Sequence, residues 1–330
     1  MYLKLPQQNQ GIMIEENSKY KNYKESAEKD FPFISIIIPT MNRKDDLFEC
    51  LASLQEMDYP KNKVELIIWD NGSIDGTLEM AKLEVKKMIP KGWSKIEIIR
   101  SHENLGPYIP YNEAVSKLSK ESQYILGLDD DTVLGKDCLK KLVDATRLDL
   151  SAGVVGGRVV YYDFPEKTMP SAGYINWWFG RFIDLNTEQL TECDYVIGCC
   201  WLIDKNIFNE VGGFDKDYFT MQWEMDFCRR VQKRGFKIYY QPEAIIKHKV
   251  PLEGKRVGLY YQYRNKLFLI KKNASPLQKL TSMSLYSLFW LPKIILNSLI
   301  ANRGINAEEL RIIIKAVYHG IIGKVGKLEI

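Results

Sequence analysis

Two short apolar runs decide the fold: FISIIIP at residues 33–39 and VELIIWD at residues 64–70. Both are rich in β-branched residues and end at a turn residue, which is typical of buried strands. The segment between them, RKDDLFECLASLQ, has apolar residues at helical spacing, namely Leu47, Cys50, Leu51 and Leu54. A strand, a helix and a second strand, with the strands apolar on both faces, predict a parallel α/β sheet that helices cover on both sides.

The same alternation continues along the first half of the chain. It predicts a helix from about Thr77, a strand KIEIIR, a helix near residues 112–118 and a strand QYILGL that ends at Leu128. From about Ser151 the alternation loosens into segments with aromatic, proline and glycine residues, and from Val257 to the end the patterns are helical. We therefore expect the sheet scaffold in the first half and a region that shapes a substrate site in the second.

Composition limits the classes of protein to which this chain can belong. At 330 residues and 45% hydrophobic, it is long enough to bury one large core or two modest ones. A net charge of +4, from 46 basic and 42 acidic residues, argues against nucleic-acid binding but suits an anionic ligand or a membrane surface. The six cysteines form no C-x-x-C pair and the amino terminus has no apolar signal core, so we predict reduced cysteines and a cytoplasmic protein.

Three consecutive aspartates, Asp129 to Asp131, end the strand-like run in YILGLDDDTVLG. Two carboxylates about 5 Å apart repel by roughly 3 kcal/mol at an effective dielectric constant near 20, so the cluster is costly unless a cation binds there. The structural alternative is a cap for the helix that begins near Lys136, but one aspartate would suffice for a cap. Hard oxygen ligands suit Mg²⁺ or Mn²⁺, which neutralise carboxylates and phosphates together.

Polar residues also follow the first two strands. Thr40 ends the first strand, and Asp70 begins the turn WDNGSIDGT at the end of the second. That turn has an ordinary Asx/Gly composition, but its place at the carboxyl edge of a parallel sheet is where ligands bind. There, Asp70 and Thr40 can accept hydrogen bonds from a nucleobase edge or a ribose. This half contains neither G-x-G-x-x-G nor G-x-x-x-x-G-K-[ST], which disfavours dinucleotide dehydrogenases and P-loop NTPases.

An ordered succession of motifs resembles the family 2 glycosyltransferases of GT-A fold, especially rhamnosyltransferase-like members. The motifs are ISIIIPTMNRKDDLFECLASL, WDNGSIDGT, ENLGPYIPYNEA, ILGLDDDTVL, VGGFDKDYF, EMDFCRRVQKRGFKIYYQPEAIIKH and YYQYRNKL, and they span residues 33–272. The resemblance implies a mostly parallel central sheet flanked by helices, with a helical C-terminal extension. It also implies an inverting transfer of a sugar from a UDP-, dTDP- or GDP-sugar to an acceptor hydroxyl, assisted by Mn²⁺ or Mg²⁺. The acceptor would be a glycan or a lipid-linked molecule in cell-surface polysaccharide, glycolipid or glycoprotein glycan assembly.

The resemblance also assigns roles to residues. It places Thr40 and Asp70 on the nucleobase and ribose, and it makes Asp129 and Asp131 a D-x-D pair with Asp131 as a direct metal ligand. His248 matches a histidine near metal and pyrophosphate, although a lone histidine is more often structural. The donor site implied in this way consists of Pro39, Thr40, Asn42, Arg43, Asp70, Asn71, Asn104, Gly106, Asn112, Asp129 and Asp130.

The catalytic base falls where this sequence departs from the family pattern. The family has Glu-Asp, one residue and then Asp before L-C-x-R, whereas this chain reads QWEMDFCRR. Counting back from Arg229 assigns Glu224 to the base position and Asp226 to the last acid. The alternative is that both acids only charge the first turn of a helix. The aromatic residues Tyr174, Trp177, Trp178 and Phe179 either stack on an acceptor sugar or pack internally.

Patterns and resemblance together divide the chain. We predict a polar tail at residues 1–30, a catalytic domain at 31–255 and a helical extension at 256–330. Within the domain, residues 31–150 would bind the nucleotide and residues 151–255 the acceptor.

The extension contains an apolar segment, Met283 to Ile300, with Pro292 and Lys293 inside it. It is short of the roughly 20 residues that span a bilayer, and a central lysine opposes insertion. An in-plane helix at the inner face of the cell membrane and packing on the catalytic domain both remain open.

Two rival functions also remain open. A sugar-nucleotide pyrophosphorylase would need a glycine-rich basic loop after the first strand, and PTMNRKDD has no glycine. A non-catalytic glycan- or nucleotide-binding relative is compatible with the altered acids around Glu224.

Overall fold

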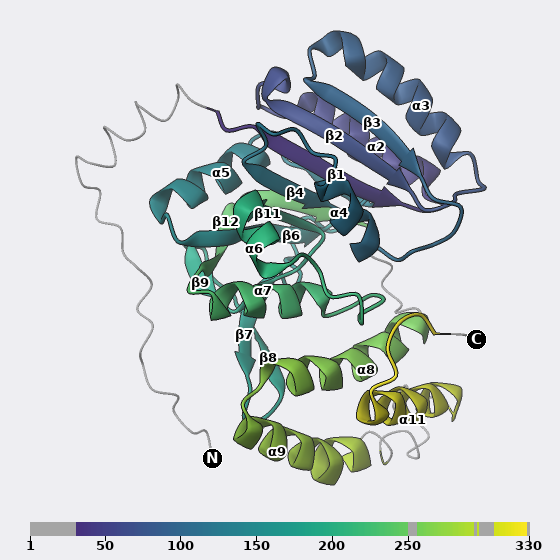
Figure 1. Ribbon diagram of the computed structural model, residues 1–330, viewed down its shortest axis with the longest axis vertical. Helices are drawn as coiled ribbons and strands as arrows, with labels where there is room; N and C mark the ends of the chain where they lie inside the picture. The colour runs from purple at the N-terminus through teal and green to yellow at the C-terminus, as the bar shows by residue number, and fades with distance from the viewer. Residues whose placement is uncertain (1–30, 250–255, 294–295, 297–306, 329–330) are drawn as a thin grey trace.

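The computed structural model describes residues 31–249, 256–293, 296 and 307–328, so the predicted tail at 1–30 lies outside the described residues. Its centre is a nine-stranded mixed sheet in the order β3-β2-β1-β4-β11-β6-β12-β5, with β9 paired to β12 (Figure 1). The first four strands in this order are Lys95–Arg100 (β3), Val64–Asp70 (β2), Ile34–Thr40 (β1) and Tyr124–Leu128 (β4). The others are Cys200–Asp204 (β11), Ala152–Tyr161 (β6), Lys237–His248 (β12), Thr132–Leu134 (β5) and Thr191–Cys193 (β9).

The first half is the predicted parallel sheet. β1 pairs with β2 in register from Ile34 opposite Val64 to Thr40 opposite Asp70, so both strands end at one edge. Helix α2 (Lys44–Glu56) connects β1 to β2, and α3 (Thr77–Met88) connects β2 to β3. The four predicted apolar positions of α2 are buried. The helix predicted near residues 112–118 is α4, Tyr108–Val115. It begins earlier than predicted because Pro110 lies in its first turn, where proline is tolerated.

The second half adds strands of both directions. β11 runs antiparallel between β4 and β6, whereas β6 and β12 run parallel to each other. In the described part of the chain, the strands β3, β2, β1, β4, β6 and β12 therefore run one way and β11, β5 and β9 the other, so the sheet is mostly parallel as expected. The helices here are α5 (Cys138–Leu148), α6 (Lys205–Val211) and α7 (Trp223–Lys233). A small separate sheet contains β7 (Ala172–Asn176), β8 (Arg181–Asp184) and β10 (Tyr195–Val196).

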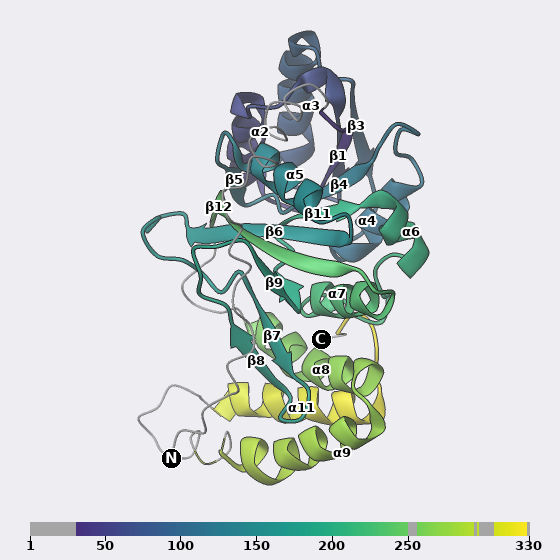
Figure 2. The same ribbon diagram turned by 90° about the vertical axis from the view of Figure 1, so that its left-hand side faces the viewer.

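Helices of the C-terminal region pack below the sheet, beside the β7–β8 hairpin (Figure 2). They are α8 (Arg256–Asn273), α9 (Pro276–Leu285), a π-helical turn η3 (Tyr286–Trp290) and α11 (Ala307–Ile322). Phe268, Leu269 and Ile270 of α8 belong to the same hydrophobic cluster as Phe227 and Val231 of α7. The first helix of the predicted extension is thus continuous with the core.

The described residues bear on two expectations, the state of the cysteines and the presence of a membrane-spanning helix. All six cysteines are buried and free, as predicted from their spacing. Among the described residues, no helix is both long enough and apolar enough to cross a bilayer. The apolar segment 283–300 forms the end of α9, the π-helical turn and a continuation to Lys293, and most of its remainder lies outside the described residues.

Candidate active site

A cleft of ≈ 290 Å³ opens at the carboxyl edge of β1, β2 and β4. This is the edge at which parallel α/β sheets bind ligands. The predicted donor-site residues that line it are Pro39, Thr40, Arg43, Asn71, Asn104, Gly106, Asp129 and Asp130. Met41, Pro107, Phe219 and Thr220 complete the lining.

Asp129, Asp131 and His248 form a cluster beside this cleft, with one potential ligand atom from each within 4.8 Å of the others. The pairing of β12 with β5 places His248 opposite Thr132, and the backbone N–H of Lys249 donates to the Asp131 carbonyl at 2.9 Å. As a result, His248 Nε2 lies 2.9 Å from Asp131 Oδ1. Sheet register therefore brings together residues that are far apart in the sequence.

The charges in this cluster strongly perturb one another. Burial, followed by the charge of Asp131, raises the pKa of Asp129 to about 8. Burial alone would lower the pKa of His248, but hydrogen bonding to Asp131 and Cys199 outweighs it and raises that pKa to about 11. Burial would raise the pKa of Asp131, but the His248 hydrogen bond and charge lower it. The repulsion inferred from the sequence is therefore present.

Two carboxylates and an imidazole nitrogen suit Mn²⁺ or Mg²⁺, since both ions accept oxygen ligands and Mn²⁺ also accepts imidazole. The raised pKa of Asp129 gives a physical reason to expect a cation here, because a cation would relieve the repulsion between Asp129 and Asp131. Arg43 Nη2 lies 3.6 Å from Asp131 Oδ2 and borders the same cleft. The donor set therefore fits a divalent cation, with a guanidinium beside it.

Three predicted donor residues do not line the cleft but shape it. Asp70 accepts a hydrogen bond from the Ser73 backbone N–H at 3.0 Å and lies 3.4 Å from Arg100 Nε. Asn42, at a φ of 53°, accepts from the Ile74 backbone N–H at 2.9 Å. Both side chains therefore hold the turn after β2 in place.

Asn112 is the third of these residues, and it acts on the opposite wall. Its Oδ1 accepts from the Phe214 backbone N–H at 2.8 Å, and its Nδ2 donates to the Phe214 carbonyl at 2.9 Å. The side chain thus fixes the loop from α6 to α7 rather than facing the cleft.

Glu224 lies in the first turn of α7, next to a backbone of unusual conformation. Met221 and Gln222 both adopt left-handed conformations, with φ of 61° and 58°, which is uncommon for residues other than glycine. Glu224 Oε2 is buried and has no hydrogen-bond partner among the described residues. Burial raises the pKa of Glu224 to about 7, and its charge in turn contributes to the raised pKa of Asp129. The carboxyl group of Glu224 can therefore exchange a proton near neutral pH, and it lies close enough to the cluster of Asp129, Asp131 and His248 for its charge to act on Asp129.

Asp226 has a different environment. Its Oδ2 accepts from Arg230 Nε at 2.8 Å and its Oδ1 accepts from Asn273 Nδ2 at 2.7 Å. The carboxylate is almost fully buried; its bond to Arg230 lies within α7, and its bond to Asn273 ties α7 to the end of α8. This geometry favours a structural role for Asp226 over proton transfer.

The chain matches the family model described as Glycosyl transferase family 2 over residues 35–212, which is more than half of its length. The chain belongs to this family. Glycosyltransferase AglE of Haloferax volcanii is 24% identical over 66% of this chain and 67% of its own length. N-acetylglucosaminyl-diphospho-decaprenol L-rhamnosyltransferase of Mycobacterium tuberculosis is 25% identical over 67% of this chain and 78% of its own length. Two further curated relatives are matched over 65% and 23% of their own length.

The solved structures confirm the fold. Mannosyltransferase PcManGT from Pyrobaculum calidifontis, in complex with GDP-Man and Mn²⁺, superposes with a TM-score of 0.59 at 17% identity, over 94% of this chain and 83% of that one. The protein is a family 2 glycosyltransferase of GT-A fold, similar to rhamnosyltransferases, as the motifs predicted.

Sequence reasoning missed residues that complete this glycosyltransferase site from the C-terminal side. Asn265 of α8 is fully buried, and its Nδ2 donates to the carbonyls of Thr220 and of Met221, the latter at 2.9 Å. Phe219 packs on Tyr261 of α8, with ring centroids 5.3 Å apart, and lines the cleft. A Cβ on Gly106 would lie 2.9 Å from the Phe219 carbonyl, so glycine permits this close approach. The motif YYQYRNKL contains Tyr261 and Asn265 and was the available signal.

The four aromatic residues proposed for acceptor stacking fall into two groups. Trp177 is buried against the Arg229 guanidinium, 5.4 Å from its ring centroid, and the Tyr174 hydroxyl donates to the Glu192 carbonyl at 3.0 Å. Trp178 and Phe179 are exposed at the tip of the β7–β8 hairpin. Internal contacts therefore account for Tyr174 and Trp177, but not for the exposed Trp178 and Phe179.

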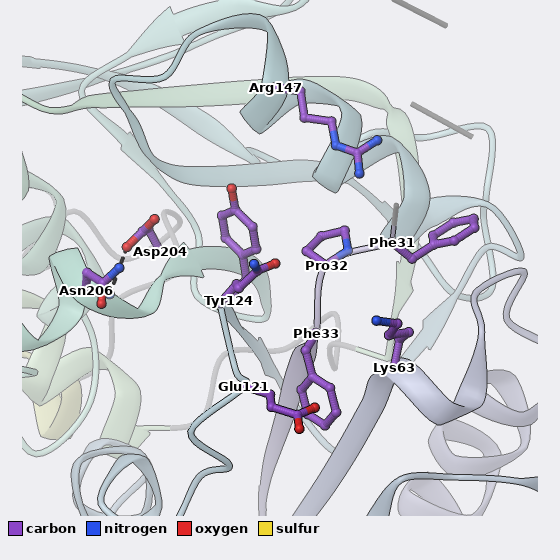
Figure 3. Close-up of a pocket in the computed structure, with 10 residues that line it drawn as sticks. Phe31, Pro32, Phe33, Lys63, Glu121, Tyr124, Arg147, Asp204 and Asn206 are labelled. Carbon is purple, nitrogen blue, oxygen red and sulfur yellow. Dashed lines mark hydrogen bonds between the residues drawn. The ribbon is translucent and has the colours of Figure 1, made fainter. Parts of the chain in front are cut away.

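A larger cavity, of ≈ 720 Å³, lies at the opposite edge of the sheet, where β1 and β4 begin (Figure 3). Phe33 precedes β1, Tyr124 begins β4, and the Asn206 backbone N–H donates to Asp204 Oδ1 at 2.8 Å at its border. None of the predicted site residues lines it, so the size of a cavity does not locate the active site in this fold.

Proposed function

We propose that the protein transfers a sugar from a UDP-, dTDP- or GDP-sugar to an acceptor hydroxyl with inversion of the anomeric configuration, in a reaction that depends on Mn²⁺ or Mg²⁺. The observation that carries this proposal is the unpartnered Glu224 carboxylate oxygen, on a group with a pKa of about 7, beside the cluster of Asp129, Asp131 and His248. Membership in family 2 and the cleft of donor-type residues support the class of reaction.

In the proposed reaction, Glu224 takes the proton from the acceptor hydroxyl as its oxygen attacks the anomeric carbon. The nucleoside diphosphate leaves from the opposite face, and one displacement inverts the configuration. Arg43 and the residues at the ends of β1 and β2 orient the donor along the cleft. A divalent cation held by Asp129, Asp131 and His248 would supply positive charge to the departing diphosphate.

The acceptor belongs to this proposal as a glycan or lipid-linked molecule in the assembly of a cell-surface polysaccharide, glycolipid or glycoprotein glycan. The name of the Mycobacterium tuberculosis relative describes a sugar linked to a lipid through a diphosphate, which supports a lipid-linked acceptor here. The division at residues 31–150, 151–255 and 256–330, a cytoplasmic location and contact with the inner face of the membrane stay predictions.

The deciding experiment measures product release. Purified protein is incubated with UDP-, GDP- and dTDP-sugars and Mn²⁺, with and without candidate acceptors, after donors that raise the melting temperature have been selected. Acceptor-dependent release of nucleoside diphosphate is expected. Formation of nucleoside triphosphate from sugar phosphate would instead identify a pyrophosphorylase, and binding without turnover would identify a non-catalytic relative.

Asp131→Ala tests the metal part of the proposal. Removal of this carboxylate should abolish the increase in nucleotide affinity that Mn²⁺ causes, because the diphosphate then faces Asp129 and Asp130 without a fully ligated cation. The measurement is titration calorimetry with UDP, GDP and dTDP, with Mn²⁺ or with EDTA. Asp163→Ala, at an exposed loop position, is the matched control. An unchanged Mn²⁺ dependence in Asp131→Ala would contradict the assignment.

A further inference from the structure

A third cavity, of ≈ 300 Å³, lies among the C-terminal helices and is separate from the candidate active site. Strand β8 covers one side of it, and α8 and the π-helical turn form the others, in the region where the hairpin meets these helices (Figure 2). Its lining is Phe182, Gln262, Tyr263, Lys266, Tyr286, Trp290 and Lys293. None of these residues carries a negative charge.

Positive charges collect at this cavity without carboxylate partners. Lys266 Nζ lies 5.3 Å from the centroid of the Phe182 ring, and Lys293 Nζ lies 5.7 Å from that of Trp290. The Arg181 guanidinium lies over the same Trp290 ring at 5.3 Å. Among the described residues, no ion pair joins Lys266, Lys293 or Arg181 to an acid. Aromatic faces hold the cations, and such contacts offset only part of the repulsion.

Two further observations indicate an anionic ligand. The Tyr286 side chain is buried and its hydroxyl has no hydrogen-bond partner among the described residues, which costs free energy unless a ligand accepts from it. Burial and the nearby Arg181 both lower the pKa of Lys266, so the site disfavours its own positive charges. An anion would reverse that penalty and would satisfy the hydroxyl.

The surroundings indicate that the anion carries an apolar chain. Leu288 and Phe289 of the π-helical turn expose 69% and 64% of their surface, and Leu277 and Leu280 of α9 are also exposed. Exposed apolar side chains on the same helical segments that border a cationic cavity match an amphiphile better than a small inorganic ion. Two ammonium groups and a hydroxyl in the lining of one cavity suit the oxygens of a phosphate.

We propose that this cavity binds the phosphate of a phosphorylated lipid, with Lys266, Lys293 and the Tyr286 hydroxyl at the phosphate and the exposed apolar residues of α9 and the π-helical turn along the chain. Phe182 packs on Tyr195 at 6.1 Å between centroids, and the charge of Glu224 contributes to the raised pKa of Tyr195. Phe182 and Tyr195 thus form one packed link from the cavity towards Glu224. The bound lipid would be the acceptor, a role that rests on the proposed function.

The test uses the full chain without donor or metal, so that it does not depend on sugar transfer. Decyl phosphate, below its micellar concentration, is titrated into the protein by calorimetry, with inorganic phosphate and decanol as separate arms. We expect the Lys266→Gln/Lys293→Gln double variant to bind decyl phosphate about 10- to 100-fold more weakly, and Tyr286→Phe to bind it several-fold more weakly. Lys279→Gln on α9 removes the same charge outside the cavity and should bind like the wild type.

Thermal melting of each variant separates loss of binding from loss of fold, and Lys293→Gln alone changes only an exposed residue. Equal binding by the double variant and the wild type would overturn the proposal. So would inorganic phosphate or decanol binding as tightly as decyl phosphate, or an equal loss in Lys279→Gln. A lipid that binds here while no sugar is transferred would leave the site intact and contradict only its role as acceptor.

Discussion

Glu224 combines burial, an unpartnered oxygen and a strained preceding turn, so its charge is costly to the folded state. Its pKa of about 7 in the folded protein lies above the ordinary value of 4.5 for a glutamate. The folded protein therefore binds this proton more tightly, and the contribution of Glu224 to stability is lost as pH rises from about 4.5 through 7. At pH 8 the ionised carboxylate is a net penalty of about 1–3 kcal/mol.

Glu224→Gln should therefore change activity and stability in opposite directions. Transfer should fall by roughly 10²- to 10⁴-fold at unchanged donor affinity, because the amide cannot accept the proton. The free energy of unfolding should rise at pH 8 but not at pH 4, since only the ionised carboxylate is penalised. Urea unfolding at both pH values and steady-state kinetics are the measurements, with exposed Glu103→Gln as the control. A variant that is fully active would remove Glu224 from the mechanism.

The same pKa predicts the pH dependence of the wild-type enzyme. Below pH 7 the base is protonated in a growing fraction of molecules, so kcat/KM should fall about tenfold per pH unit and should level off above pH 7. Measurement at saturating Mn²⁺ keeps the carboxylates of Asp129 and Asp131 ionised, so that their own titration does not contribute to the pH profile. A flat profile between pH 5 and 8 would show that Glu224 is not the base.

At the scale of elements, α7 carries one acid with an unpartnered oxygen, Glu224, and a second acid, Asp226, that attaches the helix to α8. Asp226→Asn should weaken the bonds to Arg230 and Asn273, and breaking a buried pair of this kind costs about 3–5 kcal/mol when a charge is left unpaired. We expect a lower melting temperature, with kcat reduced less than in Glu224→Gln. Glu210→Gln, which breaks an exposed pair with Arg234, should change stability little. If Asp226→Asn were stable but inactive, Asp226 and not Glu224 would be the base.

Elements with local signals were predictable from the sequence. The strands predicted at residues 64–70 and 95–100 have those bounds, because each is a short run rich in β-branched residues between turn segments. The sequence did not predict that β11 runs antiparallel between β4 and β6, since strand pairing is set by distant segments. For the same reason, the sequence did not show that apolar residues of α8, the first helix of the predicted extension, share a hydrophobic cluster with α7.

The candidate site shows the same limit. The cluster of Asp129, Asp131 and His248 was predicted because its residues occupy motif positions, and the structure brings them together. Asn42 and Asn112 occupy motif positions as well, but their side chains bond to backbone groups, which no motif reveals. Asn265 was missed because its role depends on a strained turn more than forty residues earlier, where it holds the Met221 carbonyl.

At the scale of the whole molecule, the active site depends on helices outside the sheet. Fully buried Arg264 of α8 lies among the rings of Tyr260, Tyr261 and Phe268 and donates to the Gly326 carbonyl at 2.6 Å. Lys271 donates to the Gly320 carbonyl of α11 at 2.9 Å. Since α8 also holds the turn before Glu224 through Asn265, α11 supports that turn indirectly, through α8.

Gly320→Ala tests this dependence, because local and global effects predict opposite results. In an isolated helix the change is stabilising by about 1 kcal/mol, since alanine has the higher helix propensity. In this protein a Cβ at Gly320 would lie 2.8 Å from Leu267 Cδ1 and 3.1 Å from the Arg264 carbonyl, so α11 must move away from α8. We expect a loss of about 1–3 kcal/mol, seen as a lower melting temperature, and a several-fold lower kcat at unchanged donor KM. Ile314→Ala, at an exposed position of α11, should leave kcat unchanged. A more stable and fully active Gly320→Ala would mean that α11 does not support the active site, and that the turn before Glu224 is held from the sheet alone.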